Sequence, residues 1–106
     1  MRKTKPSSFE SAGRKPKHYV LRLYVAGTSA RSARAIQNAR EICETNLKGR
    51  YDLEVVDIFQ QPKLAKDEQI IAVPTLLKKL PIPIRRFIGD LSDKENLLVG
   101  LDLKPK

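Results

Sequence analysis

The alternation of apolar and polar residues predicts a strand, a helix and a second strand over residues 19–59. The stretch YVLRLYV is largely apolar on both faces, which is typical of a strand inside a sheet. Thr28 or Ser29 can cap a helix that ends near Lys48, before Gly49. One face of that helix is apolar and holds Ala35, Ile36, Ala39, Ile42, Cys43 and Leu47. With YDLEVVDIF as the second strand, these lengths predict a right-handed parallel crossover.

The second half of the chain fits two patterns of secondary structure. A short helix is predicted from Pro62 to Ile70, because proline is favourable in the first turn of a helix. The next stretch, AVPTLLKKLPIPIRRFIGD, begins with a predicted strand at Thr75–Leu80. Its end, PIRRFIGD, could form another strand, Ile84–Ile88, after a proline turn, or it could open a helix. The sequence leaves both alternatives open.

The last stretch, SDKENLLVGLDL, predicts a helix that begins after Ser92. Ser92 and Glu95 have the spacing of a capping box, although the final LDL alternates like a strand. Taken as strand, helix, strand, helix, strand, strand, helix, the chain has the order of an α/β thioredoxin-like fold. Val73-Pro74-Thr75 then stands where that fold places a cis-proline.

The residue chemistry argues against catalysis. A dithiol enzyme needs two thiols after the first strand, but that loop is AGTSARS, and the lone Cys43 lies on the apolar helical face, where a buried thiol is expected. AGTSARS also lacks the ending of a phosphate loop. His18 is the only histidine, so metal clusters and catalytic triads lack parts. Asp90 and Asp93 are interpreted as turn and capping residues. We therefore expect no enzyme activity and no cofactor.

Composition and charge divide the chain into an arm and one domain. The chain has 106 residues, 41% hydrophobic and 31% charged, as in a single soluble domain. Residues 1–17 carry six Lys/Arg and one acidic residue of a chain with net charge +9, and are predicted to be a disordered basic arm. We expect a domain at 18–103 and a tail at 104–106. No apolar run suits a membrane helix, and one cysteine without a secretory signal indicates the cytoplasm.

Two long tracts resemble one known family. YVLRLYVAG and PKLAKDEQIIAVPTLLKKLPIPIRRFIGDLSDKENLLVGLDL, with the spacing between them, are similar to the KaiB family of clock-associated proteins over about residues 18–103. The resemblance implies a metamorphic protein with two folds. One is a tetrameric ground state ordered strand, helix, strand, strand, helix, helix, strand (βαββααβ), and the other is a thioredoxin-like monomer (βαβαββα). Two folds from one sequence require a segment that can form either a helix or a strand, and the stretch after Leu80 is such a segment.

The resemblance also implies a non-enzymatic function in circadian timing. In the family, the thioredoxin-like state binds the RecA-like ATPase hexamer of KaiC, captures KaiA and competes with a histidine kinase that bears a thioredoxin-like sensor domain. The matching positions imply that partner binding uses Arg34, Asp52, Glu54, Gln69, Pro74 and Arg86. They also imply that the balance between the folds depends on Tyr19, Gly100 and Asp102. A KaiB-like role in stress response without KaiA fits equally well.

Two other functions are compatible with the residues. A thioredoxin-like enzyme could bind glutathione through Thr28 or Ser29, and a nucleic-acid binder could use the basic arm with Arg85 and Arg86. The second lacks a stacking platform, since aromatic residues make up 6% of the chain, so nucleic acid is not an expected partner.

Three further expectations concern the ambiguous half. Adjacent strand residues point to opposite sides, so one member of the pairs Lys78-Lys79 and Arg85-Arg86 must find a partner or cover apolar surface with its stem. In the ground state, the half-exposed apolar tract Leu76–Ile88 predicts self-association. Gly100→Ala should favour the thioredoxin-like state, because alanine is better than glycine inside a helix by about 0.8–1 kcal/mol.

Overall fold

The computed structural model describes residues 18–103, so the predicted arm and tail lie outside the described residues. Its elements follow in the order β1 (Tyr19–Val25), α1 (Ala30–Asn46), β2 (Tyr51–Asp57), α2 (Pro62–Asp67), β3 (Thr75–Leu80), β4 (Arg85–Ile88) and α3 (Lys94–Gly100). This order confirms the thioredoxin-like alternative of the two predicted patterns. The stretch that could have opened a helix at Pro83 is the strand β4 here.

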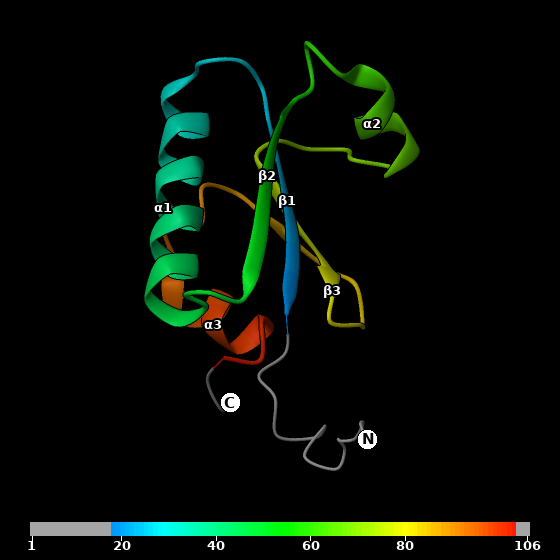
Figure 1. Ribbon diagram of the computed structural model, residues 1–106. Helices are drawn as coiled ribbons and strands as arrows, with labels where there is room; N and C mark the ends of the chain where they lie inside the picture. The colour runs from blue at the N-terminus through cyan, green and yellow to red at the C-terminus, as the bar shows by residue number, and fades with distance from the viewer. Residues whose placement is uncertain (1–17, 104–106) are drawn as a thin grey trace.

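The four strands form one mixed sheet in the order β2-β1-β3-β4 (Figure 1). β1 and β2 are parallel, with Tyr19 opposite Tyr51 and Val25 opposite Asp57, which confirms the predicted crossover through α1. β3 is antiparallel to β1, and β4 is antiparallel to β3. Within residues 18–103, β2 and β4 are therefore the two edges of the sheet.

Helices cover both faces of this sheet. α1 and α3 lie on one face, and α2 lies on the other, beside the end where β2 finishes (Figure 1). Leu21 and Leu23 of β1 pack with α1 and α3, whereas Tyr24 packs with Ala65 of α2. β1 thus contributes to two cores, as its largely apolar faces predict. No helix in the described part has the length and hydropathy to cross a membrane.

The ends of α1 and α2 follow the predicted signals, with one shift. Ser29 rather than Thr28 is the N-cap of α1, and its Oγ accepts a hydrogen bond from Ser32 N at 3.1 Å. α2 begins at Pro62 but ends at Asp67 instead of Ile70. The reason is that Gln69 adopts a left-handed conformation, with φ +56°, which a right-handed helix excludes.

The start of α3 differs from the predicted capping box. Asp93, not Ser92, is the N-cap, and its Oδ1 accepts a hydrogen bond from Asn96 N at 3.3 Å. Ser92 N instead donates to Asp90 Oδ1 at 3.1 Å, within the turn that precedes the helix. The turn uses Ser92, and aspartate is as good an N-cap as serine, so the helix begins one residue later.

The apolar tract Leu76–Ile88 divides into a buried and an exposed part. Leu76 and Leu77 are at most 2% exposed. Beyond them, four large aliphatic residues are 49–74% exposed: Leu80, Ile82, Ile84 and Ile88. The β3–β4 hairpin and the edge strand therefore carry apolar surface that the described part of the chain does not cover.

Candidate partner-binding surface

The segment before β3 and the segment after β4 meet beside Pro74. The Val73-Pro74 peptide bond is cis, as predicted, and Gly89 N donates a hydrogen bond to Pro74 O at 2.9 Å. Thr75 Oγ1 donates to Ala72 O at 2.6 Å on the same segment. Pro74 itself is buried. Pro74 therefore joins the two neighbouring segments from within the fold and is not part of the exposed surface.

Arg34 reaches the same region from α1. Its Nε lies 3.2 Å from Asp90 Oδ2, and Asn38 Nδ2 donates to Asp90 O at 2.8 Å. Hydrogen bonds from Ser92 and from Arg34 lower the pKa of Asp90 below its ordinary value, so this side chain stays a carboxylate. The loop after β4 is thus fastened to α1, with an exposed arginine over it.

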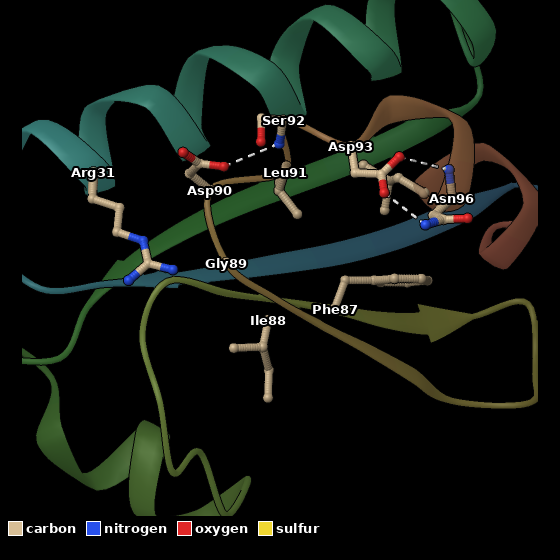
Figure 2. A pocket seen from close by; sticks show the side chains of 10 residues that line it. Arg31, Phe87, Ile88, Gly89, Asp90, Leu91, Ser92, Asp93 and Asn96 are labelled. Atoms are coloured by element: carbon tan, nitrogen blue, oxygen red, sulfur yellow. Dashed lines mark hydrogen bonds between the residues drawn. The ribbon is translucent and has the colours of Figure 1, made fainter.

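A hollow of about 330 Å³ lies between this loop, α1 and the start of α3, with Arg31 and Phe87 at its walls (Figure 2). Its two carboxylates are both engaged locally. Asp90 Oδ1 accepts from Ser92 N, and Asp93 Oδ2 accepts from Asn96 Nδ2 at 2.6 Å. This confirms the interpretation of Asp90 and Asp93 as turn and capping residues.

Arg86 and Gln69 lie together beside β4, on the face of the sheet that α2 covers. Arg86 Nη2 donates to Glu68 O at 2.7 Å, and Nη1 donates to Gln69 O at 3.3 Å. Both contacts satisfy carbonyl groups at the end of α2 and leave the side chains of Arg86 and Gln69 exposed. An apolar groove of about 570 Å³ adjoins them and is lined by Gln69, Ile70, Ile71, Thr75, Arg86 and Ile88.

The other two predicted binding residues lie on the opposite edge of the sheet. Asp52 and Glu54 belong to β2, which β1 and β3 separate from β4. His18 Nε2 lies 2.9 Å from Asp52 Oδ2, and Arg22 Nε lies 3.0 Å from Glu54 Oε1. The structure therefore brings Arg86 and Gln69 together on the α2 face, and places Arg34 on the α1 face against the loop after β4. Asp52 and Glu54 lie at the opposite edge of the sheet from β4.

Ion pairs connect the two edges across the sheet. Arg22 contacts Glu68 at 3.1 Å as well as Glu54, and Lys79 Nζ lies 3.0 Å from the same Glu68 carboxylate. Burial alone would raise the pKa of Glu68, but Lys79 and Arg22 together hold it below its ordinary value. Because Arg86 binds the backbone carbonyl of Glu68, this network joins both edges to α2.

Tyr19 and Asp102, two of the predicted switch residues, lie at the other end of the sheet, where α3 finishes. Tyr19 Oη donates a buried hydrogen bond to Leu101 O at 2.6 Å, across 82 positions of sequence. Burial, and then the charge of Asp102, raise the pKa of Tyr19. Asp102 has φ +62°, and its Oδ2 lies 3.9 Å from Nζ of the fully buried Lys78. These contacts attach the end of α3 to β1 and β3.

Gly100, the third predicted switch residue, lies at the end of α3 and faces Phe87 of β4. A Cβ atom at position 100 would come within 2.9 Å of Phe87 Cζ and closer still to Cε1. Helix propensity alone, on which the expectation for Gly100→Ala was based, does not include this contact. Phe87 is on an edge strand and half-buried, so its ring must turn to make room and will offset part of the expected gain.

Comparison with known proteins identifies the family. A family model described as the KaiB domain matches residues 22–103. The chain belongs to the KaiB family. It is 55% identical over 87 residues to a circadian clock oscillator protein KaiB of Prochlorococcus marinus, covering 82% of this chain and 83% of that protein. A KaiB of the same description from Picosynechococcus is 54% identical over 87 residues, covering 82% and 84%.

Solved structures agree on the fold of this KaiB family member. The N-terminal domain of Synechococcus elongatus SasA superposes with a TM-score of 0.70 at 21% identity, covering 100% of this chain and 98% of that one. Chloroplastic thioredoxin z gives a TM-score of 0.67 at 16% identity, covering 89% and 85%. At these identities the likeness establishes the thioredoxin-like fold alone.

The one cysteine of the chain lies buried within α1. Cys43 is 2% exposed, and burial raises the pKa of its thiol to about 11, so it is protonated at neutral pH. Its burial on the apolar face of α1 confirms the expectation. Ser29, proposed as a glutathione ligand, is engaged as the N-cap, with its Oγ 2.9 Å from Ser32 Oγ. Among residues 18–103, no group of three His, Cys, Asp or Glu side chains could hold a metal ion.

Two features of this surface were not predicted from the sequence. The first is the exposure of Ile71, which lies outside the expected half-exposed tract Leu76–Ile88 and is 91% exposed in the groove beside Arg86. No periodic signal marked it, because Ile71 stands between the predicted helix and the predicted strand. The second is which member of Lys78-Lys79 is buried. The pair was predicted to split, and Lys79 binds Glu68 while Lys78 lies inside.

Proposed function

We propose that this chain is a non-enzymatic regulatory protein that binds a KaiC-type RecA-like ATPase ring in its thioredoxin-like state, in the cytoplasm. The observation that carries the proposal is 55% identity to a circadian clock oscillator protein KaiB over most of both chains. The process served is circadian timing or a related stress response. The buried, protonated Cys43 supports a regulatory rather than a redox role.

The surface beside Pro74 is the proposed ring-binding face. Arg34 from the α1 face and Arg86 from the α2 face present two exposed cations there, each held by contacts to backbone or carboxylate oxygens. Gln69 adds an exposed polar side chain on a backbone with φ +56°. Arginine with neighbouring apolar surface is the composition that interface hot spots favour.

Asp52 and Glu54 are proposed to act at the rim. Their carboxylates are exposed and already paired with His18 and Arg22, so they influence approach and partner choice more than affinity. Their position on β2 leaves that edge accessible when a ring is bound beside β4. KaiA, or a histidine kinase with a thioredoxin-like sensor domain, is the proposed additional partner or competitor. The likeness to the SasA N-terminal domain supports competition.

The resting protein is proposed to be a tetramer of the ground-state fold. In that fold, residues from Pro83 onward form a helix and LDL forms a strand, so β4 and the end of α3 exist only in the binding state. The weak burial of β4 supports this change of fold, because three of its four residues are exposed. Little packing is then lost when β4 unfolds, so the two folds can differ in free energy by only a few kcal/mol.

The direct test is binding of the full chain to a hexameric KaiC-type ATPase from the same organism. We expect the hexamer to co-elute with the wild-type chain. Arg34→Ala should weaken binding by about tenfold or more, the factor that 1.4 kcal/mol produces. Arg40→Ala, an exposed arginine of the same helix, is the matched control and should bind normally. A wild-type chain that leaves the hexamer unbound in both ATP and ADP contradicts the proposal.

A further inference from the structure

The outer edge of β4 carries backbone hydrogen-bonding groups that pair with no other strand among residues 18–103, and it lies beside an apolar groove. β3 and β4 are antiparallel with Thr75 opposite Ile88 and Leu77 opposite Arg86. Opposed residues of an antiparallel pair alternate between those that exchange two hydrogen bonds and those that exchange none. The alternation decides which backbone groups of β4 face β3 and which face outward.

The hydrogen bond at Gly89 determines the phase of this alternation. Gly89 N donates to Pro74 O, and the register places Gly89 opposite Pro74. The bonded pairs are then Leu76 with Phe87 and Lys78 with Arg85, two and four positions along. Arg86 and Ile88 fall between them, so their N–H and C=O groups point away from β3. In the described part of the chain, no strand lies on that side.

The side chains of Arg86 and Ile88 lie on the face of the groove of about 570 Å³. Three isoleucines, Ile70, Ile71 and Ile88, line this groove, and Ile71 is 91% exposed. The residues that line it include one cation, Arg86, and no acidic side chain. Arg85, on the opposite face of the same strand, is also exposed.

We propose that β4 binds an extended, acidic and aliphatic segment of the partner protein by strand addition. The partner backbone would pair with Arg86 and Ile88, and every second side chain would enter the groove against Ile71 and Ile88. Carboxylates of the segment would meet Arg85 and Arg86. This proposal rests on the proposed function, because the ring-type ATPase is the partner that supplies the segment.

Short, charged edge strands are a common protection against pairing. β4 is short and carries two arginines, but protection does not require exposed isoleucines or an apolar groove beside it. Those features cost solubility in a free monomer and are useful only when covered. The pairing site would also exist in one fold only, since the ground state is proposed to make this segment a helix. Recognition would therefore select the thioredoxin-like state directly.

The test is amide hydrogen exchange of the full chain, alone and saturated with the same hexameric KaiC-type ATPase. The amides of Arg86 and Ile88 should exchange quickly in the free chain and at least about tenfold more slowly in the complex, which corresponds to 1.4 kcal/mol. The matched control is the other edge, where the amides of Leu53 and Val55 point away from β1. Their exchange should not change.

Two substitutions at one position separate backbone from side chain. Ile88→Pro removes the outward N–H without removing a bond to β3, whereas Ile88→Ala keeps the N–H and removes the side chain. We expect the proline variant to bind the hexamer at least about tenfold more weakly than the alanine variant. Proline would also disfavour a ground-state helix here and so raise the competent population. A loss of binding is therefore not explained by population.

Each outcome is decisive. A hexamer that does not bind the wild-type chain contradicts the proposed function itself. A complex that forms without slowing Arg86 and Ile88, or in which Ile88→Pro and Ile88→Ala bind alike, overturns strand addition at β4 and leaves the proposed function standing. Protection of Leu53 and Val55 instead would assign the pairing to β2. Concentration-dependent protection of Arg86 and Ile88 without the hexamer would assign the edge to a second copy of this chain.

Discussion

The two halves of the sheet use their aliphatic residues in different ways. In β1, Leu21, Leu23 and Val25 are at most 2% exposed beneath α1 and α3. At the other side, Leu80, Ile84 and Ile88 are 49–64% exposed. Burial holds the first half in this fold, because each covered aliphatic side chain contributes about 1.5–3 kcal/mol to the stability of the folded state. β3 is buried at Leu76 and Leu77, but the hairpin end and β4 have little cover among residues 18–103, which suits the proposed partner binding and change of fold.

The largest expected effect compares one residue from each half. Leu23→Ala should lower the free energy of unfolding by about 2–5 kcal/mol, because Leu23 is 0% exposed and leaves a cavity. Ile88→Ala should change it by at most about 0.5 kcal/mol, since the side chain is largely in water. Urea denaturation at equilibrium measures both. Equal losses would show that packing holds β4 as firmly as it holds β1.

A second prediction concerns the contact between β1 and the end of α3. Tyr19→Phe removes the donor to Leu101 O and should cost the thioredoxin-like state about 1–3 kcal/mol, the range for a buried acceptor left without its donor. Two slowly exchanging sets of NMR peaks would report a shift toward the ground state. Tyr51→Phe is the matched control, because its hydroxyl bonds Glu44 at the exposed surface. Equal shifts in both variants would remove Tyr19 from the switch residues.

A third prediction separates helix propensity from packing at Gly100. Alanine should favour α3 by about 0.8–1 kcal/mol, and the turn of the Phe87 ring should offset much of that gain. Gly100→Ala alone should therefore move the two peak sets toward the thioredoxin-like state by less than about tenfold. In a Phe87→Leu background, Gly100→Ala should shift the peak sets further than it does in the wild-type chain. Equal shifts in the two backgrounds would show that the Phe87 ring does not oppose the alanine.

The smallest expected effect is a pH dependence from Glu68. Its folded pKa lies below the ordinary 4.5, so its ion pairs stabilise the protein above that pH, and the contribution is lost as pH falls through the folded pKa. Glu68→Gln should lower stability at pH 7 by a few tenths of a kcal/mol and flatten the acid side of the profile. Asp67→Asn changes a neighbouring, exposed carboxylate and should leave both the stability at pH 7 and the acid side of the profile unchanged. A profile that Glu68→Gln leaves unchanged would contradict the network.

The order of elements in the first half was predictable because its signals are strong and local. The two-sided apolar pattern of β1, the apolar face of α1 and the second strand all depend on periodicity within a few residues. The cis proline and the burial of Cys43 followed from their positions in these elements. The predicted cap at Ser92 failed because neighbouring polar residues compete for the same backbone donors, and local geometry decides between them.

The sequence by itself determined the crossover of the first half, the absence of a thiol pair and a second half compatible with both strand and helix. The tertiary structure decided what depends on contacts between distant segments. It buried Lys78 rather than Lys79, brought Phe87 against Gly100, separated Asp52 and Glu54 from the other predicted binding residues, and turned the backbone of Arg86 and Ile88 outward. Periodicity indicates that a residue is on a face, but only the neighbouring strand determines whether that face or edge is covered.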